Sequence, residues 1–178
     1  MTSATQTKRL RQRFELWDTD HDGTVKRSDY EAEAIRTVKA FGGSPDSPVG
    51  RQVIASYLGI WDYLAPKAGS GVNGAMSADE FVSVVEFEVL SAGGAGFNKV
   101  LRATIEAIVE LCDTDGDHLV SPKEFRKWGK AIGLSQEDAD LAFEKIDSDH
   151  DGYLDADELI NTVRDYHLGT SDVPLLGL

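Results

Sequence analysis

An acidic twelve-residue segment, running from Asp147 to Glu158, constrains this chain more than any other part of its sequence. The segment reads DSDHDGYLDADE, with aspartates at positions 1, 3 and 5, a glycine at position 6 and a glutamate at position 12. Alternate residues of a tightly coiled loop point toward its centre, so these carboxylates can converge on one point. Ca²⁺ takes about six to eight oxygen ligands, and this spacing supplies them. The segment therefore predicts a Ca²⁺ site between two helices.

Two other segments follow the same pattern with departures. Residues 18–29 read DTDHDGTVKRSD, and residues 113–124 read DTDGDHLVSPKE. In the first, Lys26 at position 9 cannot donate an oxygen, and Asp29 at position 12 has a shorter arm than glutamate. Because fewer oxygens favour the six-coordinate Mg²⁺, we expect poorer discrimination between the two ions there. In the second, His118 occupies position 6, where a positive φ costs a non-glycine residue about 1 kcal/mol.

A fourth segment, residues 69–80, keeps only part of the pattern. Gly74 stands at position 6 and Glu80 at position 12, but glycines occupy positions 1 and 3 and Asn73 occupies position 5. Without the leading carboxylates, we expect negligible binding of divalent ions. The chain is therefore expected to bind about three Ca²⁺ ions, with Mg²⁺ possible at the first site.

The candidate metal ligands comprise side-chain carboxylates and one backbone carbonyl at position 7 of each acidic loop. They are Asp18, Asp20, Asp22, Thr24, Asp29, Asp113, Asp115, Asp117, Leu119, Glu124, Asp147, Asp149, Asp151, Tyr153 and Glu158.

Position 8 is apolar in all four segments, although ion binding does not require it. The four residues are Val25, Met76, Val120 and Leu154. This pattern indicates that loops pair side by side through a short strand contact, each contributing one side chain to the core. The silent loop at 69–80 would then serve as the structural partner of the loop at 18–29, and the loop at 113–124 would pair with the loop at 147–158.

The segments between the loops read as helices. Apolar residues recur at helical spacing in 7–17, 28–41, 53–61 and 101–112, and Ser77 and Ser135 are typical helix starts. Pro122 stands at a favoured first helical position, and a last helix is expected at 156–166. The glycine-rich segment 91–96 is the best candidate linker. We therefore expect an all-α fold with one loop pair in residues 1–92 and a second in residues 93–178, followed by an apolar tail.

The layout of four loops beginning at residues 18, 69, 113 and 147, with a silent second loop, resembles the sarcoplasmic calcium-binding proteins, and especially the bacterial calerythrins. This resemblance covers about residues 7 to 166. It implies four EF-hand helix-loop-helix units in two pairs packed into one compact body. It also implies an intracellular Ca²⁺ and Mg²⁺ buffer. Asp29 at the last position of the first loop also resembles the sequence pattern of that family. His118 departs from the family pattern.

Charge and composition limit the other classes of function. The chain has 31 acidic residues against 18 basic ones and a net charge of −13, which disfavours nucleic acid and anionic membranes as partners. It contains neither the apolar run of a membrane span nor, at its start, that of a signal peptide, so we expect a cytoplasmic protein. The expected partners are calcium ions. We expect a monomer and identify no protein partner.

A buffer and a sensor remain as the two hypotheses. A sensor exposes a methionine-rich groove when Ca²⁺ binds, but this chain has only two methionines. The aromatic residues of its helices suit a fixed core, which favours a buffer. The four histidines lie mostly within the loops, and no nucleophile or phosphate-binding loop is recognisable, so we expect no enzyme activity.

Overall fold

Most helices begin where a side chain can accept a hydrogen bond from the first turn. Ser3, Ser47, Ser77, Ser121 and Ser135 each accept one from the backbone N–H three residues later. The computed structural model describes residues 3–71, 73–173 and 175. In chain order its elements are α1 (Ala4–Trp17), β1 (Thr24–Lys26), α2 (Arg27–Ala40), α3 (Pro48–Lys67), β2 (Ala75–Ser77), α4 (Ala78–Val85), the π-helical segment η1 (Glu86–Leu90), α5 (Gly93–Cys112), α6 (Pro122–Ala131), α7 (Gln136–Ile146) and α8 (Ala156–Leu168).

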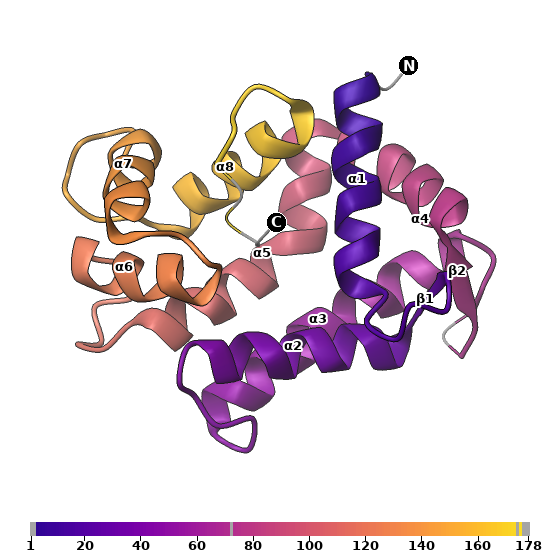
Figure 1. Cartoon of the computed structure of the whole chain (residues 1–178), viewed down its shortest axis with the longest axis horizontal. Coiled ribbons are helices and arrows are strands. Elements are labelled where there is room, and N and C mark those ends of the chain that lie inside the picture. The colour runs from indigo at the N-terminus through magenta and orange to yellow at the C-terminus, as the bar shows by residue number, and fades with distance from the viewer. Residues whose placement is uncertain (1–2, 72, 174, 176–178) are drawn as a thin grey trace.

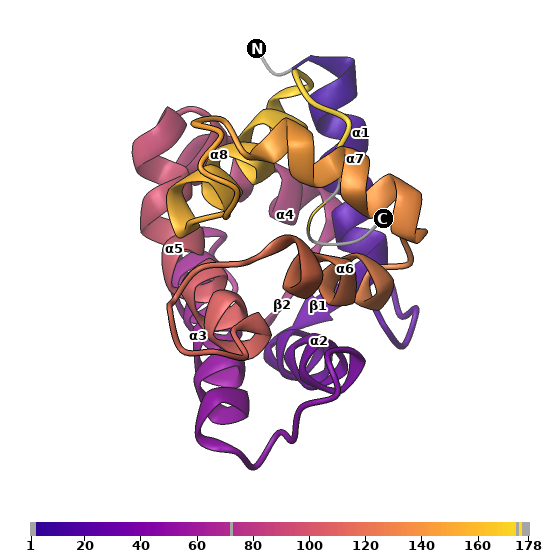
Figure 2. The same ribbon diagram turned by 90° about the vertical axis from the view of Figure 1, so that its left-hand side faces the viewer.

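These elements form four helix-loop-helix units, which confirms the predicted all-α class. The first pair of units comprises α1 to α4 and lies toward the right and the bottom of Figure 1, with β1 and β2 at its edge. The second pair comprises α5 to α8, and α6 and α7 lie on the opposite side of the molecule. Figure 2 turns α6 and α7 toward the viewer, with α2 and α3 below them.

The core of the first pair is built from aromatic rings. Trp17 packs edge-on against Tyr30 at 4.3 Å between ring centroids, and Tyr30 packs against Trp61 at 5.3 Å. Phe14 of α1 contacts Phe81 of α4. Because edge-to-face pairs add a specific geometry to apolar burial, these rings fix the helices that flank the first two loops.

The two pairs share one continuous hydrophobic core. Buried residues of α1, α3, α5 and α8 belong to the same cluster, and α3 packs against α5 while α1 packs against α8. Phe41, directly after the end of α2, lies edge-on to Trp128 of α6, at 5.9 Å between centroids. The structure thus joins the halves tightly, and the division of the chain into two loop pairs at residues 92 and 93 stays a prediction.

The glycine-rich segment 91–96 differs from the flexible linker that its composition predicted. Helix α5 begins at Gly93, so most of the segment is the first turn of a helix. A Cβ at Gly96 would lie 2.4 Å from the carbonyl oxygen of Val89. The glycine is therefore required by close packing of α5 against η1, and the connection is a tight turn.

The chain after α8 returns to the body of the protein. Val173 and Leu175 are buried, and the indole Nε1–H of Trp128 donates to the carbonyl oxygen of Leu175 at 3.0 Å. Arg9 of α1 donates to the carbonyl of Ser171 at 2.7 Å. Part of the apolar tail noted in the sequence, residues 174 and 176–178, lies outside the described residues. No helix in the described part of the chain is long and apolar enough to cross a bilayer.

Candidate metal centres

The three acidic loops share one hydrogen-bonded skeleton. The carboxylate at position 1 accepts the backbone N–H of position 6: Asp18 from Gly23 at 2.9 Å, Asp113 from His118 at 2.9 Å, and Asp147 from Gly152 at 3.2 Å. The carboxylate at position 5 accepts the N–H of position 7, at 2.8–2.9 Å in each loop. These bonds curl each loop, and the carboxylates of positions 1 and 3 come together in all three loops. The candidate carbonyl donors at position 7, Thr24, Leu119 and Tyr153, are thereby fixed in the same register.

Each acidic loop also contains two residues with positive φ, at positions 4 and 6. In the first and last loops these are a histidine followed by a glycine: His21 and Gly23, then His150 and Gly152. In the loop at 113–124 the order is reversed, with Gly116 at φ 85° and His118 at φ 62°. His118 therefore adopts a backbone conformation that histidines in the other loops adopt two residues earlier, at position 4, and the exchange keeps positive φ at both positions.

The loop at 147–158 has the clearest need for a cation. Asp147 is 8% exposed, and its Oδ1 is buried without a hydrogen-bond donor. Asp147, Asp149 and Glu158 each place one carboxylate oxygen within 4.8 Å of the others. A buried carboxylate oxygen without a donor is costly unless a charge of opposite sign compensates it, so this donor set fits a divalent ion.

Hydrogen bonds from the loop backbone hold the carboxylate of Glu158 in place without an ion. Its Oε1 accepts the backbone N–H of Ser148 at 2.8 Å, and its Oε2 accepts the N–H of Asp155 at 3.2 Å. Asp151 lies outside the group of three, and its Oδ1 accepts the N–H of Tyr153. Its position in the loop is nevertheless the predicted one.

The loop at 113–124 has the same construction. Asp113, Asp115 and Glu124 form its group of three oxygens within 4.8 Å, and Asp117 lies outside it. Glu124 is 3% exposed. Burial pushes the pKa of Glu124 up, but hydrogen bonds from Thr114 and Ser121 outweigh this and lower the pKa to about 2. Burial and the neighbouring Asp117 raise the pKa of Asp115. Glu124 is therefore charged and oriented at neutral pH.

The loop at 18–29 departs from the other two at its end. Asp18, Asp20 and Asp22 form its group, but Asp29 does not join them. Asp29 Oδ2 accepts the N–H of Lys26 at 2.7 Å, and its Oδ1 accepts the hydroxyl of Thr19 at 3.2 Å. Unlike the glutamates, Asp29 makes no bond to the backbone N–H of position 2 among those found in the described residues.

Lys26 affects the loop at 18–29 through its positive charge as well as through its lack of a ligand oxygen. Its ammonium group donates to Asp22 and lies 3.9 Å from Asp20 Oδ2. Hydrogen bonds from Lys26 and Thr24 lower the pKa of Asp22 to about 2. The lysine at position 9 thus places a positive charge against two candidate ligands, Asp20 and Asp22. An incoming cation must displace this ammonium group.

The loop at 69–80 lacks the skeleton of the other three. Gly74 at position 6 lies outside the left-handed region, and a Cβ there would meet the carbonyl oxygen of Ser70 at 1.9 Å. Glu80 is drawn onto Ser77, accepting its N–H and its hydroxyl at 2.8 Å. No group of metal-holding side chains occurs in this loop among its described residues.

Pairing through position 8 is confirmed for both pairs of loops. Val25 faces Met76 in the antiparallel ladder of β1 and β2. Val120 and Leu154 form a bridge in which each N–H donates to the other's carbonyl at 2.9 Å. All four side chains are fully buried. The loop at 69–80 is therefore the structural partner of the first loop, and the loops at 113–124 and 147–158 are coupled directly.

The sequence reading missed the role of position 2. Thr114 and Ser148 each donate both their backbone N–H and their hydroxyl to the glutamate at position 12. A hydroxyl residue directly after the first aspartate was a visible signal, since Thr19, Thr114 and Ser148 all stand there. These residues orient the last ligand and are not themselves candidate ligands.

Known proteins share both the sequence and the fold. A family model described as an EF-hand domain matches residues 138–169. Calerythrin from Saccharopolyspora erythraea is 37% identical over 177 residues, which is 99% of this chain and 100% of that protein. The sarcoplasmic calcium-binding protein beta chain from Penaeus is 27% identical over 115 residues, covering 62% of this chain and 58% of its own.

A solved structure extends the likeness of the fold. The structure of a calcium-binding protein of Streptomyces coelicolor, described as the structural basis for prokaryotic calcium-mediated regulation, superposes with a TM-score of 0.73 at 24% identity. The match covers 92% of this chain and 98% of that one. At that level of identity the likeness concerns the fold alone.

Proposed function

This chain belongs to the calerythrin family of EF-hand calcium-binding proteins, and from that premise we propose that it is a cytoplasmic Ca²⁺ buffer with three working sites. The loops at 113–124 and 147–158 each bring a glutamate at position 12 together with two aspartates. The loop at 18–29 brings three aspartates together without its last carboxylate. We assign Ca²⁺ to all three loops and Mg²⁺ competition chiefly to the first, because it offers the fewest oxygens.

In each loop the carboxylates at positions 1, 3 and 5, the carbonyl at position 7 and the carboxylate at position 12 would hold the ion. The ion would relieve the repulsion among these carboxylates and satisfy the buried Oδ1 of Asp147. Binding should therefore stabilise the folded chain, by about 2.7 kcal/mol for each site at a hundredfold excess over its Kd.

The burial of Met76 is the observation that most favours a buffer over a sensor. A sensor presents methionines in a groove that opens when Ca²⁺ binds, whereas Met76 is fully buried in the strand pair between two loops. The large apolar side chains exposed in the described chain are Phe87 of η1, Leu141 of α7 and Tyr153 in the loop at 147–158. Such scattered residues do not form a docking surface.

Fluorescence of the dye ANS with and without Ca²⁺ separates the two functions. For a buffer we expect no large rise in dye fluorescence when Ca²⁺ saturates the folded protein. The Glu158→Gln variant, titrated in parallel, controls for dye effects of the ion itself. A large Ca²⁺-dependent rise in a protein with unchanged helical circular dichroism would instead support a sensor, with a regulatory role such as the one named for the Streptomyces coelicolor protein.

A further inference from the structure

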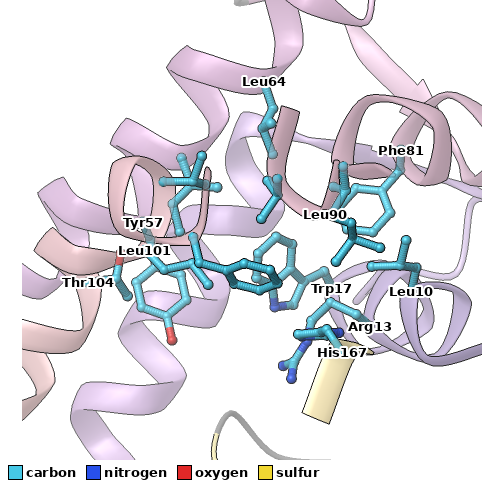
Figure 3. A pocket seen from close by; sticks show the side chains of 15 residues that line it. Leu10, Arg13, Trp17, Tyr57, Leu64, Phe81, Leu90, Leu101, Thr104 and His167 are labelled. Atoms are coloured by element: carbon cyan, nitrogen blue, oxygen red, sulfur yellow. The ribbon is translucent and has the colours of Figure 1, made fainter. Parts of the chain in front are cut away.

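A small cavity lies in the core where five helices and η1 meet. Its volume is about 60 Å³, several times the roughly 10–15 Å³ that one water molecule needs. Its walls are largely apolar and include Leu64 of α3, Phe81 of α4, Leu90 of η1 and Leu101 of α5. Figure 3 shows these side chains around Trp17 of α1, whose indole ring lies across the middle of the site. None of the candidate metal ligands lines this cavity.

Two buried polar groups on the cavity wall have no hydrogen-bond partner. Thr104 of α5 is 2% exposed and His167 of α8 is 7% exposed. Thr104 Oγ1 and His167 Nδ1 are both without a partner in the described chain. In Figure 3, Thr104 lies beside Tyr57 and Leu101, and His167 lies on another side of the cavity beside Arg13. Because a buried polar atom without a partner is destabilising, two such atoms in residues that line one cavity indicate a polar guest.

The chemistry of these groups restricts the guest. Burial, with the charges of Arg13 and Arg9, lowers the pKa of His167 to about 3, so its imidazole is neutral at pH 7. A neutral imidazole and a threonine hydroxyl can each donate or accept one hydrogen bond. Arg13 and Tyr57 also line the cavity. The remaining wall is apolar and aromatic, which suits a flat ring better than a chain of waters or a hydrated ion.

We propose that this cavity binds a neutral single-ring aromatic molecule that carries one hydroxyl group. The ring would pack against Trp17, Phe81 and the leucines, while the hydroxyl would hydrogen-bond to His167 or Thr104. A ligand there would contact α1, α4, α5 and α8 at once, and these helices flank all four loops. The site is additional to the ion sites and does not depend on the buffer function.

The probe is 4-fluorophenol, observed by ¹⁹F NMR with the full-length, Ca²⁺-saturated protein. Fluorobenzene has the same ring without a hydroxyl and serves as the apolar comparison. We expect saturable binding of 4-fluorophenol and a preference over fluorobenzene of about fivefold, the worth of one neutral hydrogen bond. The two probes differ in the hydroxyl group, which only 4-fluorophenol can hydrogen-bond to His167 or Thr104.

Four substitutions and one control locate the binding. Thr104→Val keeps the side-chain shape, and His167→Leu removes the imidazole, so the two together should abolish the preference for 4-fluorophenol. Val100→Phe places a ring in the cavity and should abolish binding of both probes, and Leu101→Phe repeats this test if the first variant is unstable. Thr7→Val, on α1 outside the cavity, should change nothing.

The outcomes decide the proposal. Loss of 4-fluorophenol binding in the filled variants, with Ca²⁺ titration unchanged, supports it. The proposal is wrong if neither probe binds saturably, since water alone would then fill the cavity. It is also wrong if binding survives in both filled variants, or if the preference for the hydroxyl survives the loss of both Thr104 and His167.

Discussion

Lengthening the side chain at position 12 of the first loop should change which ion it prefers. In the second half, Glu124 and Glu158 reach the leading aspartates and also accept the N–H of position 2. Asp29 does neither, being held by the N–H of Lys26 and the hydroxyl of Thr19. Asp29→Glu should therefore supply one more carboxylate oxygen to the ion. Glu124, at the equivalent position, is equally buried, so the fold accommodates the longer arm there.

The size of this effect follows from the added oxygen. Half a unit charge at about 2.4 Å from a divalent ion contributes about 1.7 kcal/mol even at the dielectric constant of bulk water. Part of this replaces a water ligand, so we expect Ca²⁺ affinity at this loop to rise about tenfold, equivalent to about 1.4 kcal/mol. Mg²⁺, which requires six ligands in a tight octahedron, should gain much less.

Isothermal titration with Ca²⁺, in the absence and the presence of Mg²⁺, measures both quantities. The wild type should lose Ca²⁺ affinity at one site when Mg²⁺ is added, and Asp29→Glu should lose far less. Asp29→Asn, which keeps the arm length and removes the charge, is the matched control and should weaken both ions. An unchanged ratio of Ca²⁺ to Mg²⁺ affinity in Asp29→Glu would refute the idea that arm length limits this site.

Three further perturbations test the rest of the account. Glu158→Gln should weaken one Ca²⁺ site about a hundredfold by calorimetry, since a charged bidentate ligand is lost, and three unaltered binding steps would contradict its assignment. Leu154→Ala should lower the free energy of unfolding by about 2–5 kcal/mol in urea titrations, because the side chain is fully buried, and should also weaken the neighbouring loop across its bridge to Val120. The lowered pKa of Glu124, about 2 against an ordinary 4.5, means that its contribution to stability is complete above pH 4.5 and is lost as the pH falls toward 2. Urea unfolding of the chelator-treated protein should therefore depend less on pH over that range in Glu124→Gln than in the wild type.

The loops could be predicted because their chemistry depends on local spacing. Twelve consecutive residues fix which side chains face the centre, so the pattern from Asp147 to Glu158 needed no tertiary information. The apolar residue at position 8 also predicted the contacts of Val25 with Met76 and of Val120 with Leu154, which the structure confirms. Which of the candidate side chains coordinate an ion stays a prediction.

Other features depend on contacts between distant segments and could not be predicted. Gly96 looks like part of a flexible linker, and only the approach of Val89 shows that it is a packing residue. The sequence indicated only that Lys26 cannot donate an oxygen to the ion, whereas in the structure its ammonium group lies against Asp22. The sequence assigned no role to His167, which lies outside the acidic loops. Its place on the wall of the cavity that Thr104 also lines requires α5 and α8 to pack together, which no local pattern specifies.

The number of Ca²⁺ ions bound by each chain tests the central claim most directly. Equilibrium dialysis against radioactive Ca²⁺ in the absence of Mg²⁺ should give three ions per chain for the wild type and two, at subsaturating concentrations, for Glu158→Gln. A fourth ion would show that the loop at 69–80 is not silent. One or two ions in the wild type would contradict the assignment of working sites to the loops at 18–29, 113–124 and 147–158.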